Sequence, residues 1–362
     1  MMRINRILAA VIVSLVLWSG SAAQRVERYS VAALNDNRVV YALPLTHLYL
    51  QVELEKVIEQ PGELSLYAER FLGSRDAIIE PATYYQLKGL NLGAYGVADP
   101  DQRYSIDFKK NSTATDVSLT KEGILIGVNV NTTDVVQLPE TKKPMIGRTD
   151  DLSSRMLPPE YIQATTIAAK AQILADEIYR TRESRNLVIS GESEQPFADG
   201  EALKIAVERL DQRELAFMGL FNGIRQSAEG VEVVANLSAT EEGHRVVARF
   251  SEQLGLLTHD DLRGEPIYLD LEIIEQAPQL EEREQSKLQK RLEKGITYRV
   301  PGLVRATVTF RGERMVSKEI PVAQLGSLEA LDMVLFTTKG KNTSVEFYPS
   351  NGGLKEVREI HQ

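Results

Sequence analysis

Residues 48–54 alternate between apolar and polar positions along the chain. Leu48, Leu50, Val52 and Leu54 occupy the even positions, whereas the odd positions carry Tyr, Gln and Glu. Successive side chains of a strand point to opposite faces, so this alternation predicts a half-buried strand. Shorter alternating runs follow at 84–90, 104–108, 116–119 and 124–130. Together they predict a β-rich N-terminal domain over residues 24–145.

One short helix is expected inside that domain. Residues 63–72 carry apolar side chains at helical spacing, at Leu64, Ala68 and Phe71. Gly73 follows the last of them, in the position where a helix commonly ends in a left-handed residue. Asp99-Pro100-Asp101 has the residues of a type I turn, and we expect a turn there.

The hydrophobic period then changes from two residues to about 3.6. Residues 160–189 place Ile167, Ala171, Leu174 and Ile178 on one face, and residues 201–221 do the same with Leu203, Val207, Leu210, Phe217 and Phe221. A polar connection at 191–200 joins the two segments, with Asp199 available as a helix N-cap. Two amphipathic helices joined by a short loop pair antiparallel. We therefore expect a central antiparallel helical hairpin over residues 155–225. Residues 141–159 contain three prolines and are expected as a linker or a long exposed loop.

Alternation returns in the last third of the chain. Short runs are expected as strands at 231–237, 245–250, 267–274, 296–300, 303–311, 314–322, 332–338 and 344–348. A polar helix is expected at 279–294, and Arg311-Gly312 reads as a hairpin turn. Closely spaced strands predict a β-sandwich-like C-terminal domain over residues 228–362. The fold class predicted for the whole chain is α+β.

The first residues have the organisation of an export signal. Arg3 and Arg6 are followed by an apolar run from Ile7 to Trp18 and by the small residues Ser21, Ala22 and Ala23. This is typical of a signal peptide over residues 1–23, cleaved before Gln24. The alternative is an uncleaved membrane anchor. Cleavage predicts an exported protein with no transmembrane segment, in the periplasm or, as open alternatives, at the cell surface or outside the cell.

Composition narrows the function classes. The 362 residues include 51 acidic and 42 basic side chains, for a formal net charge of −9, and no cysteine. Nucleic acid is excluded as an expected partner because phosphate backbones are bound by clustered Lys and Arg. The lack of cysteine rules out disulfides, thiol nucleophiles and thiolate metal sites. It also rules out lipid attachment through a cysteine at the cleavage site.

Several strings resemble a known family. They include Tyr41-Ala42-Leu43-Pro44, Asp99-Pro100-Asp101-Gln102, Ala198-Asp199-Gly200-Glu201 and Gly264-Glu265-Pro266-Ile267-Tyr268. With further strings in the helical centre, they resemble domain-of-unknown-function family 4831, exported proteins of anaerobic Gram-negative bacteria. The resemblance covers nearly the whole mature chain. It implies export from a Gram-negative cell and supplies no catalytic or binding residues.

The densest cluster of ligand-type side chains is His259, Asp260, Asp261 and Glu265. Oxygen ligands this close together can hold Ca²⁺, and two carboxylates can act as general acid and base. The spacing is not that of a calcium loop, and His-Asp-Asp between two strands is also a common solvated turn. Both interpretations stay open at this stage, with the turn favoured.

A second candidate is a basic cluster on the first long helix, Arg180, Arg182 and Arg185. Guanidinium groups bind anions and acidic partners, so the cluster is a candidate partner surface. The alternative is a set of ion pairs with Glu177 on the same helix and with Asp211 or Glu214 on the second helix. The ion-pair interpretation is favoured.

These observations assign no catalytic, cofactor-binding or metal-binding residue, and no cofactor is expected. The favoured hypothesis is a non-enzymatic interaction or assembly protein of the cell envelope, with an envelope protein as partner. One alternative is a carboxylate-dependent hydrolase of envelope or dietary polymers, which needs two carboxylates about 5 to 9.5 Å apart. Another is a soluble binder of a small ligand between the domains.

Overall fold

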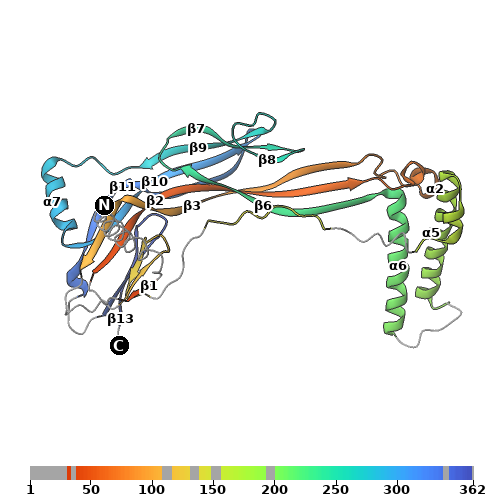
Figure 1. Cartoon of the computed structure of the whole chain (residues 1–362), viewed down its shortest axis with the longest axis horizontal. Coiled ribbons are helices and arrows are strands. Elements are labelled where there is room, and N and C mark those ends of the chain that lie inside the picture. The colour runs from red at the N-terminus through yellow and green to blue at the C-terminus, as the bar shows by residue number, and fades with distance from the viewer. Residues whose placement is uncertain are drawn as a thin grey trace, which may run out of the picture.

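The computed structural model describes residues 31–33, 38–107, 116–130, 138–147, 156–192, 200–336 and 342–360. The predicted signal peptide and Asp199 lie outside these ranges. The described residues form three antiparallel sheets and a group of helices, which confirms the α+β class. The molecule is elongated, with two of the sheets at one end and most of the helices at the other (Figure 1).

A three-stranded sheet runs along the molecule and joins its ends (Figure 1). Its order is β3 (Ala82–Asp107), β2 (Arg38–Gln60) and β6 (Ile224–Ser238). We call the part of this sheet nearest the helices the shaft. The prediction of separate strands at 84–90 and 104–108 was wrong, because both belong to β3. Two bulges in the β2/β3 pairing, at Ala42/Pro44 and Glu53/Leu54, absorb the irregular residues without ending the strand.

The second sheet packs on one face of the first. Its order is β11 (Glu313–Asp332), β10 (Gly295–Phe310), β9 (Glu265–Glu275), β7 (Gly243–Ser251) and β8 (Gly255–Leu257). The even-numbered residues predicted to be buried, from Leu48 to Leu54, are at most 1 % exposed and face Leu269 and Val304 in this core. Strands predicted separately at 296–300 and 303–311 form the single strand β10. The expected Arg311-Gly312 turn joins β10 to β11, and both residues have positive φ.

The third sheet combines the two ends of the chain. Its order is β1 (Val31–Ala33), β4 (Asp116–Leu119), β5 (Leu125–Val128), β12 (Asn342–Phe347) and β13 (Leu354–Ile360). The strand expected at 332–338 was wrong in its described part, where Met333–Phe336 forms a 3₁₀ helix, η2. Phe336 is fully buried in a core shared with Val128 and Phe347, so packing determines the conformation of this segment.

Strands from both β-rich regions of the sequence share sheets. β6 pairs with β2, and β12 pairs with β5. The sequence boundaries at 24–145 and 228–362 therefore do not coincide with separate sheets. Both pairs join segments that are distant in the chain.

The helices at the far end form a unit that we call the head. It consists of η1 (Ser65–Tyr67), α2 (Ala68–Leu72), α4 (Pro159–Gln163), α5 (Ile167–Ser190) and α6 (Gly200–Asn222). The expected helix at 160–189 is two helices, because Thr166 is extended and caps α5 by accepting a hydrogen bond from the Ala169 amide. The predicted left-handed residue Gly73 ends α2 with φ 69°.

The last helix, α7 (Glu282–Leu292), corresponds to the predicted polar helix at 279–294 and lies at the opposite end of the molecule from the head (Figure 1). It buries no residue. An ion pair between Arg291 and Glu329 links it to β11.

Candidate functional site

Tight backbone contacts fix the head to the tip of the shaft. The Leu64 amide donates to Leu220 O at 2.8 Å, and the Ile78 amide donates to Asn222 O at 2.9 Å. Gly223 ends α6 with φ 78°, and a Cβ at this position would lie 2.4 Å from Gln60 O. Only glycine fits this approach and this conformation without strain. The direction of α6 relative to β2 is therefore set by the backbone.

A polar contact adds to this attachment. Glu63 accepts hydrogen bonds from Lys170 Nζ at 2.8 Å and from Tyr161 Oη at 2.9 Å. The hydrogen bond from Lys170 is the main cause that lowers the pKa of Glu63, and the one from Tyr161 acts in the same direction. Burial raises the pKa of Tyr161, which keeps its hydroxyl protonated and able to donate. The contact joins the shaft tip to α4 and α5.

The predicted basic cluster lies on α5, and two of its three arginines form ion pairs with α6. Arg182 Nε is 2.6 Å from Glu214 Oε1, and Arg185 Nε is 2.8 Å from Asp211 Oδ1. The third member, Arg180, is 3.5 Å from Glu177, which also pairs with Arg213. These contacts confirm the ion-pair interpretation and the antiparallel order of the helices. Arg180 is the most exposed of the three, with a side chain 75 % exposed.

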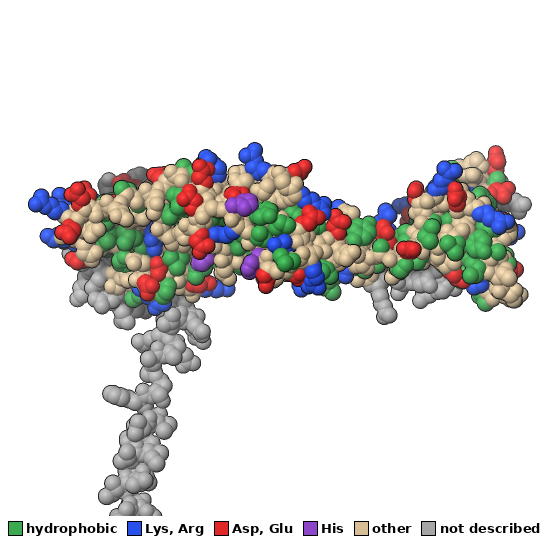
Figure 2. All heavy atoms as spheres, turned by 90° about the horizontal axis from the view of Figure 1, so that it is seen from above, with side chains coloured by type: hydrophobic (Ala, Val, Ile, Leu, Met, Phe, Trp, Pro, Cys, Tyr) green, Lys and Arg blue, Asp and Glu red, His purple; other side chains and the backbone are tan. Residues whose placement is uncertain are grey.

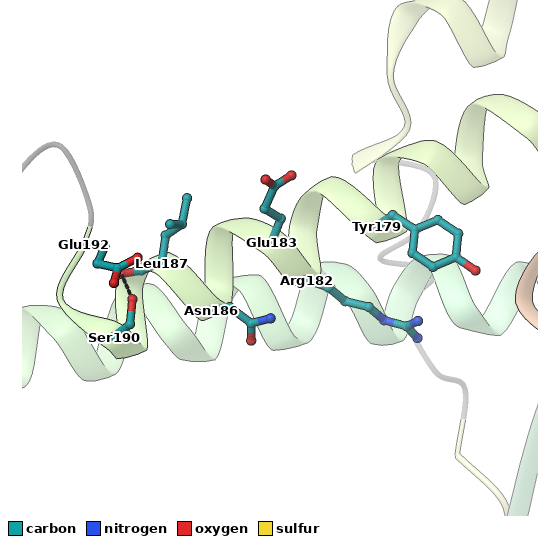
Figure 3. A pocket seen from close by; sticks show the side chains of 7 residues that line it. All are labelled: Tyr179, Arg182, Glu183, Asn186, Leu187, Ser190 and Glu192. Atoms are coloured by element: carbon teal, nitrogen blue, oxygen red, sulfur yellow. Dashed lines mark hydrogen bonds between the residues drawn. The ribbon is translucent and has the colours of Figure 1, made fainter.

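A groove of about 500 Å³ runs along α5 on the same part of the head (Figure 3). It is lined by Tyr179, Arg182, Glu183, Asn186, Leu187, Ser190 and Glu192. Tyr179 Oη donates to Phe71 O at 2.9 Å, and the Arg182 guanidinium lies 5.7 Å from the Tyr179 ring centroid. The lining combines an aromatic ring, an aliphatic side chain, a carboxamide and charges of both signs. Of these residue types, Tyr and Arg are enriched at protein–protein interfaces.

Large apolar side chains are exposed over the rest of the head. Figure 2 shows them on its visible face, beyond the narrower shaft. The most exposed are Leu66 at 78 %, Leu215 at 71 % and Ile162 at 70 %. Ile167, Ile189 and Ile205 are also exposed. An accumulation of exposed apolar side chains at one end of a molecule marks an interaction surface.

The other predicted cluster places His259, Asp260 and Asp261 in the turn between β8 and β9, and Glu265 at the first residue of β9. Arg263 Nη2 lies 2.6 Å from Asp261 Oδ2, and this hydrogen-bonded pair lowers the pKa of Asp261 to about 2. Arg249 donates to His259 O at 2.9 Å and to Gly264 O at 3.1 Å, which holds the turn.

The other carboxylates of this cluster have separate partners. Glu265 contacts Arg311 at 2.7 Å, and the hydrogen bond from Arg311 lowers the pKa of Glu265. A hydrogen bond from Thr258 lowers the pKa of Asp260. A glycosidase-type acid needs a raised pKa, so this cluster does not have the electrostatics of the hydrolase alternative. Within the described ranges, no group of three or more His, Cys, Asp or Glu side chains is placed to hold a metal ion.

Sequence reasoning missed a buried polar cluster where the three sheets meet. Arg299 Nη2 lies 3.1 Å from Asp99 Oδ2, and both side chains are about nine-tenths buried. Arg299 also donates to Ala323 O at 3.2 Å. Nearby, Thr46 Oγ1 donates to Ser350 O and accepts from the Ala323 amide. The only signal in the sequence was Asp99-Pro100-Asp101. The Asp101 amide donates to Asp99 Oδ1, but the predicted turn was wrong, because the segment stays in β3.

The fold and these surfaces define an elongated α+β protein with an exposed helical head. The chain belongs to the family described as a domain of unknown function, DUF4831, whose family model matches residues 37–355. Neither a curated protein nor a solved structure matches it. Among the described helices, none combines the length and the apolar character needed to cross a membrane.

Proposed function

We propose that this protein is a non-enzymatic interaction or assembly protein of the cell envelope, and that its head is the surface that contacts a partner protein. The observation that carries the proposal is the position of the exposed apolar side chains. Leu66, Ile162 and Leu215 are at least 70 % exposed and belong to helices held at the tip of the shaft. Burial of apolar surface is the main favourable term in protein association.

The charges of the head support a protein partner. Arg182 and Arg185 are neutralised by α6, which leaves the groove of α5 with both charge signs and no strong excess of either. Arg180 lies on the same helix with a side chain that is 75 % exposed, and it suits an acidic residue of the partner. The envelope location is supported by the signal-type sequence of residues 1–23.

Photocrosslinking in the native cell tests the head. A benzophenone amino acid replaces Leu66 or Leu215 in two variants, and Leu262 in a control. Leu262 lies in the turn before β9 and is 79 % exposed, which matches Leu66 at 78 %. We expect one discrete crosslinked partner from both head positions and none from Leu262. Equal crosslinking from all three positions, or from none, contradicts the proposal.

A fractionation experiment tests the location independently. We expect the mature chain in the periplasmic fraction, with an N-terminus at Gln24 by mass mapping. An intact Met1 in a membrane fraction contradicts the export part of the proposal. A panel of glycosidase, protease and esterase substrates tests the hydrolase alternative. Turnover that a single Asp or Glu substitution abolishes would replace the interaction protein with an enzyme.

A further inference from the structure

A second cavity lies away from the head, between the shaft and the second sheet. Its volume is about 550 Å³, and its walls include Tyr85 and Leu87 of β3, Phe250 of β7, Phe310 of β10 and Met315 of β11. Phe250 and Phe310 are buried and meet edge to face, with ring centroids 6.0 Å apart. Met315 is 40 % exposed. The cavity thus has an aromatic floor and an accessible apolar wall.

Two sheet edges border this cavity. β3 and β11 are the outermost strands of their sheets. They are linked where Lys318 Nζ donates to Leu92 O at 2.8 Å. The cavity lies further towards the head, between the Tyr84–Leu87 segment of β3 and the start of β11. An open strand edge presents N–H and C=O groups that can pair with another strand.

The register of β3 shows which groups are open. The Tyr85 amide donates to Glu252 O at 2.6 Å, so Tyr85 directs its backbone groups away from β2. Alternate residues of an antiparallel strand share this direction, and Leu87 is the next one. Within the described residues, the outward backbone groups of Leu87 and the Tyr85 carbonyl have no backbone partner. The side chains of Tyr85 and Leu87 pack against the apolar core between the first and second sheets.

Charges surround the mouth of the cavity. Arg311 is paired with Glu252 at 2.9 Å and with Glu265 at 2.7 Å, and its guanidinium lies 5.2 Å from the Phe310 ring centroid. Glu313 also lines the mouth and is exposed, and it forms no ion pair with the cations of the described ranges. The Lys56 ammonium is 5.9 Å from the Tyr85 ring. Among the charged residues that line the cavity, Glu252 and Glu313 outnumber Arg311, and Glu313 is the carboxylate without an ion pair.

The cavity and the adjoining outer edge of β3 together form the β3/β11 groove. We propose that this groove binds an extended peptide segment of a partner protein, added as a strand to the outer edge of β3. One apolar side chain of the peptide enters the cavity against Phe310 and Met315, and a neighbouring Lys or Arg meets Glu313. Main-chain pairing supplies affinity in such strand addition, and pockets for alternate side chains supply specificity. The groove is a second contact site that does not depend on the head.

A peptide display library tests the groove on the full chain. Random heptapeptides are selected for binding, and the best peptide is labelled and titrated by fluorescence anisotropy. We expect enrichment of peptides that combine a central apolar residue with Lys or Arg. Met315→Glu should weaken binding at least tenfold, because it places a second carboxylate against the apolar side chain of the peptide. Met145→Glu is the matched control, since Met145 is 87 % exposed and lies outside the groove, and it should bind as the wild type does.

Further measurements distinguish strand addition from other modes of binding. Methylation of alternate peptide amides should abolish binding if the peptide pairs with β3. Equal affinity of the methylated peptide overturns strand addition in favour of an apolar ligand site. Absence of enrichment, or equal binding by Met315→Glu and the wild type, overturns the proposal. The proposal is also overturned if no peptide binds and the chain instead associates with itself in a way that Met315→Glu abolishes. Leu215→Ala in the head should leave peptide affinity unchanged, and thermal unfolding confirms that each variant is folded.

Discussion

At the scale of single residues, the buried Asp99–Arg299 pair links two of the sheets. Its two side chains come from β3 and β10 and are about 10 % exposed. The Arg299 amide also donates to Gly352 O at 3.1 Å, which ties the same residue to the segment before β13. A buried ion pair stabilises weakly compared with apolar packing, but loss of one partner leaves a buried charge without compensation. The pair therefore constrains how the three sheets meet.

Arg299→Met should reduce the free energy of unfolding by about 3 kcal/mol, because it leaves the Asp99 carboxylate buried and unpaired. Adding Asp99→Asn to the Arg299→Met variant should restore part of the lost free energy of unfolding. Arg358→Met is the control, since Arg358 pairs with Glu356 on the exposed face of β13, and its cost should stay below about 1 kcal/mol. Urea denaturation measures all three. Equal losses of unfolding free energy in Arg299→Met and Arg358→Met would show that the Asp99–Arg299 pair is not effectively buried.

Glu63 should make the stability of the head depend on pH in the acid range. Its pKa in the folded protein lies below the ordinary value of 4.5, mainly through the hydrogen bond from Lys170. A depressed pKa stabilises the fold above the unfolded value, and that contribution is lost as pH falls through the folded value. The melting temperature of Glu63→Gln should be lower than that of the wild type at pH 7, and the gap should close below about pH 4.5. A gap that stays constant from pH 7 to pH 3 would contradict this assignment.

At the scale of elements, the α5/α6 pair is packed unevenly along its length. Phe217 and Phe221 are fully buried with Leu174 and Ile178, close to the shaft. Further from the shaft the seam consists of the ion pairs of Arg182 and Arg185, and Leu210 is only half-buried. The hydrophobic stripe predicted from sequence is thus buried at one end and partly open at the other. The apolar packing that stabilises the head therefore lies at the end of the α5/α6 pair nearest the shaft.

Phe217→Ala should lower the free energy of unfolding by about 3 to 4 kcal/mol, because it removes a fully buried ring and leaves a cavity. Leu215→Ala, two residues earlier on the opposite face, is the control and should change it by less than about 0.5 kcal/mol. Chemical denaturation monitored by circular dichroism at helical wavelengths compares the two. Similar costs would indicate that Leu215 is covered in solution, which would also count against its role as a contact residue.

At the scale of the whole molecule, the length of β2 and β3 determines the shape. The 26 residues of β3 span roughly 86 Å at about 3.3 Å per residue. The strand joins the two five-stranded sheets to the head without a break (Figure 1). One end of the molecule is therefore held far from the other by a continuous hydrogen-bonded element, a geometry that suits a protein with separate contact sites.

Small-angle X-ray scattering should show this elongation. A compact chain of 362 residues has a radius of gyration of about 21 Å. We expect a clearly larger value, and a distance distribution with a tail that extends beyond about 80 Å, as the length of β3 requires. Gln60 and Gly223 stay in contact in the folded chain, so the distribution should keep its tail across a range of salt concentrations. A value near 21 Å would contradict the elongated arrangement.

Sequence reasoning was most successful where the cause is local. The alternation at 48–54, the left-handed end at Gly73 and the turn at Arg311-Gly312 were all predicted and confirmed. The ion pairs of Arg182 and Arg185 with α6 were also foreseen, because helical spacing fixes which side chains can meet. Each of these features depends on residues that are near in sequence or on neighbouring helices, and its pattern is visible in the chain itself.

The tertiary structure alone decided which distant segments pair. Tyr41 donates to Thr297 O across 256 residues, and Thr46 donates to Ser350 O across 304. No local pattern records such pairings, which explains why β3 and β10 were expected as shorter pieces. The groove between β3 and β11 arises from this pairing, and so do the buried Arg299–Asp99 contact and the Glu265–Arg311 ion pair. A strand's period fixes which face is apolar, whereas its neighbours depend on packing of the whole chain.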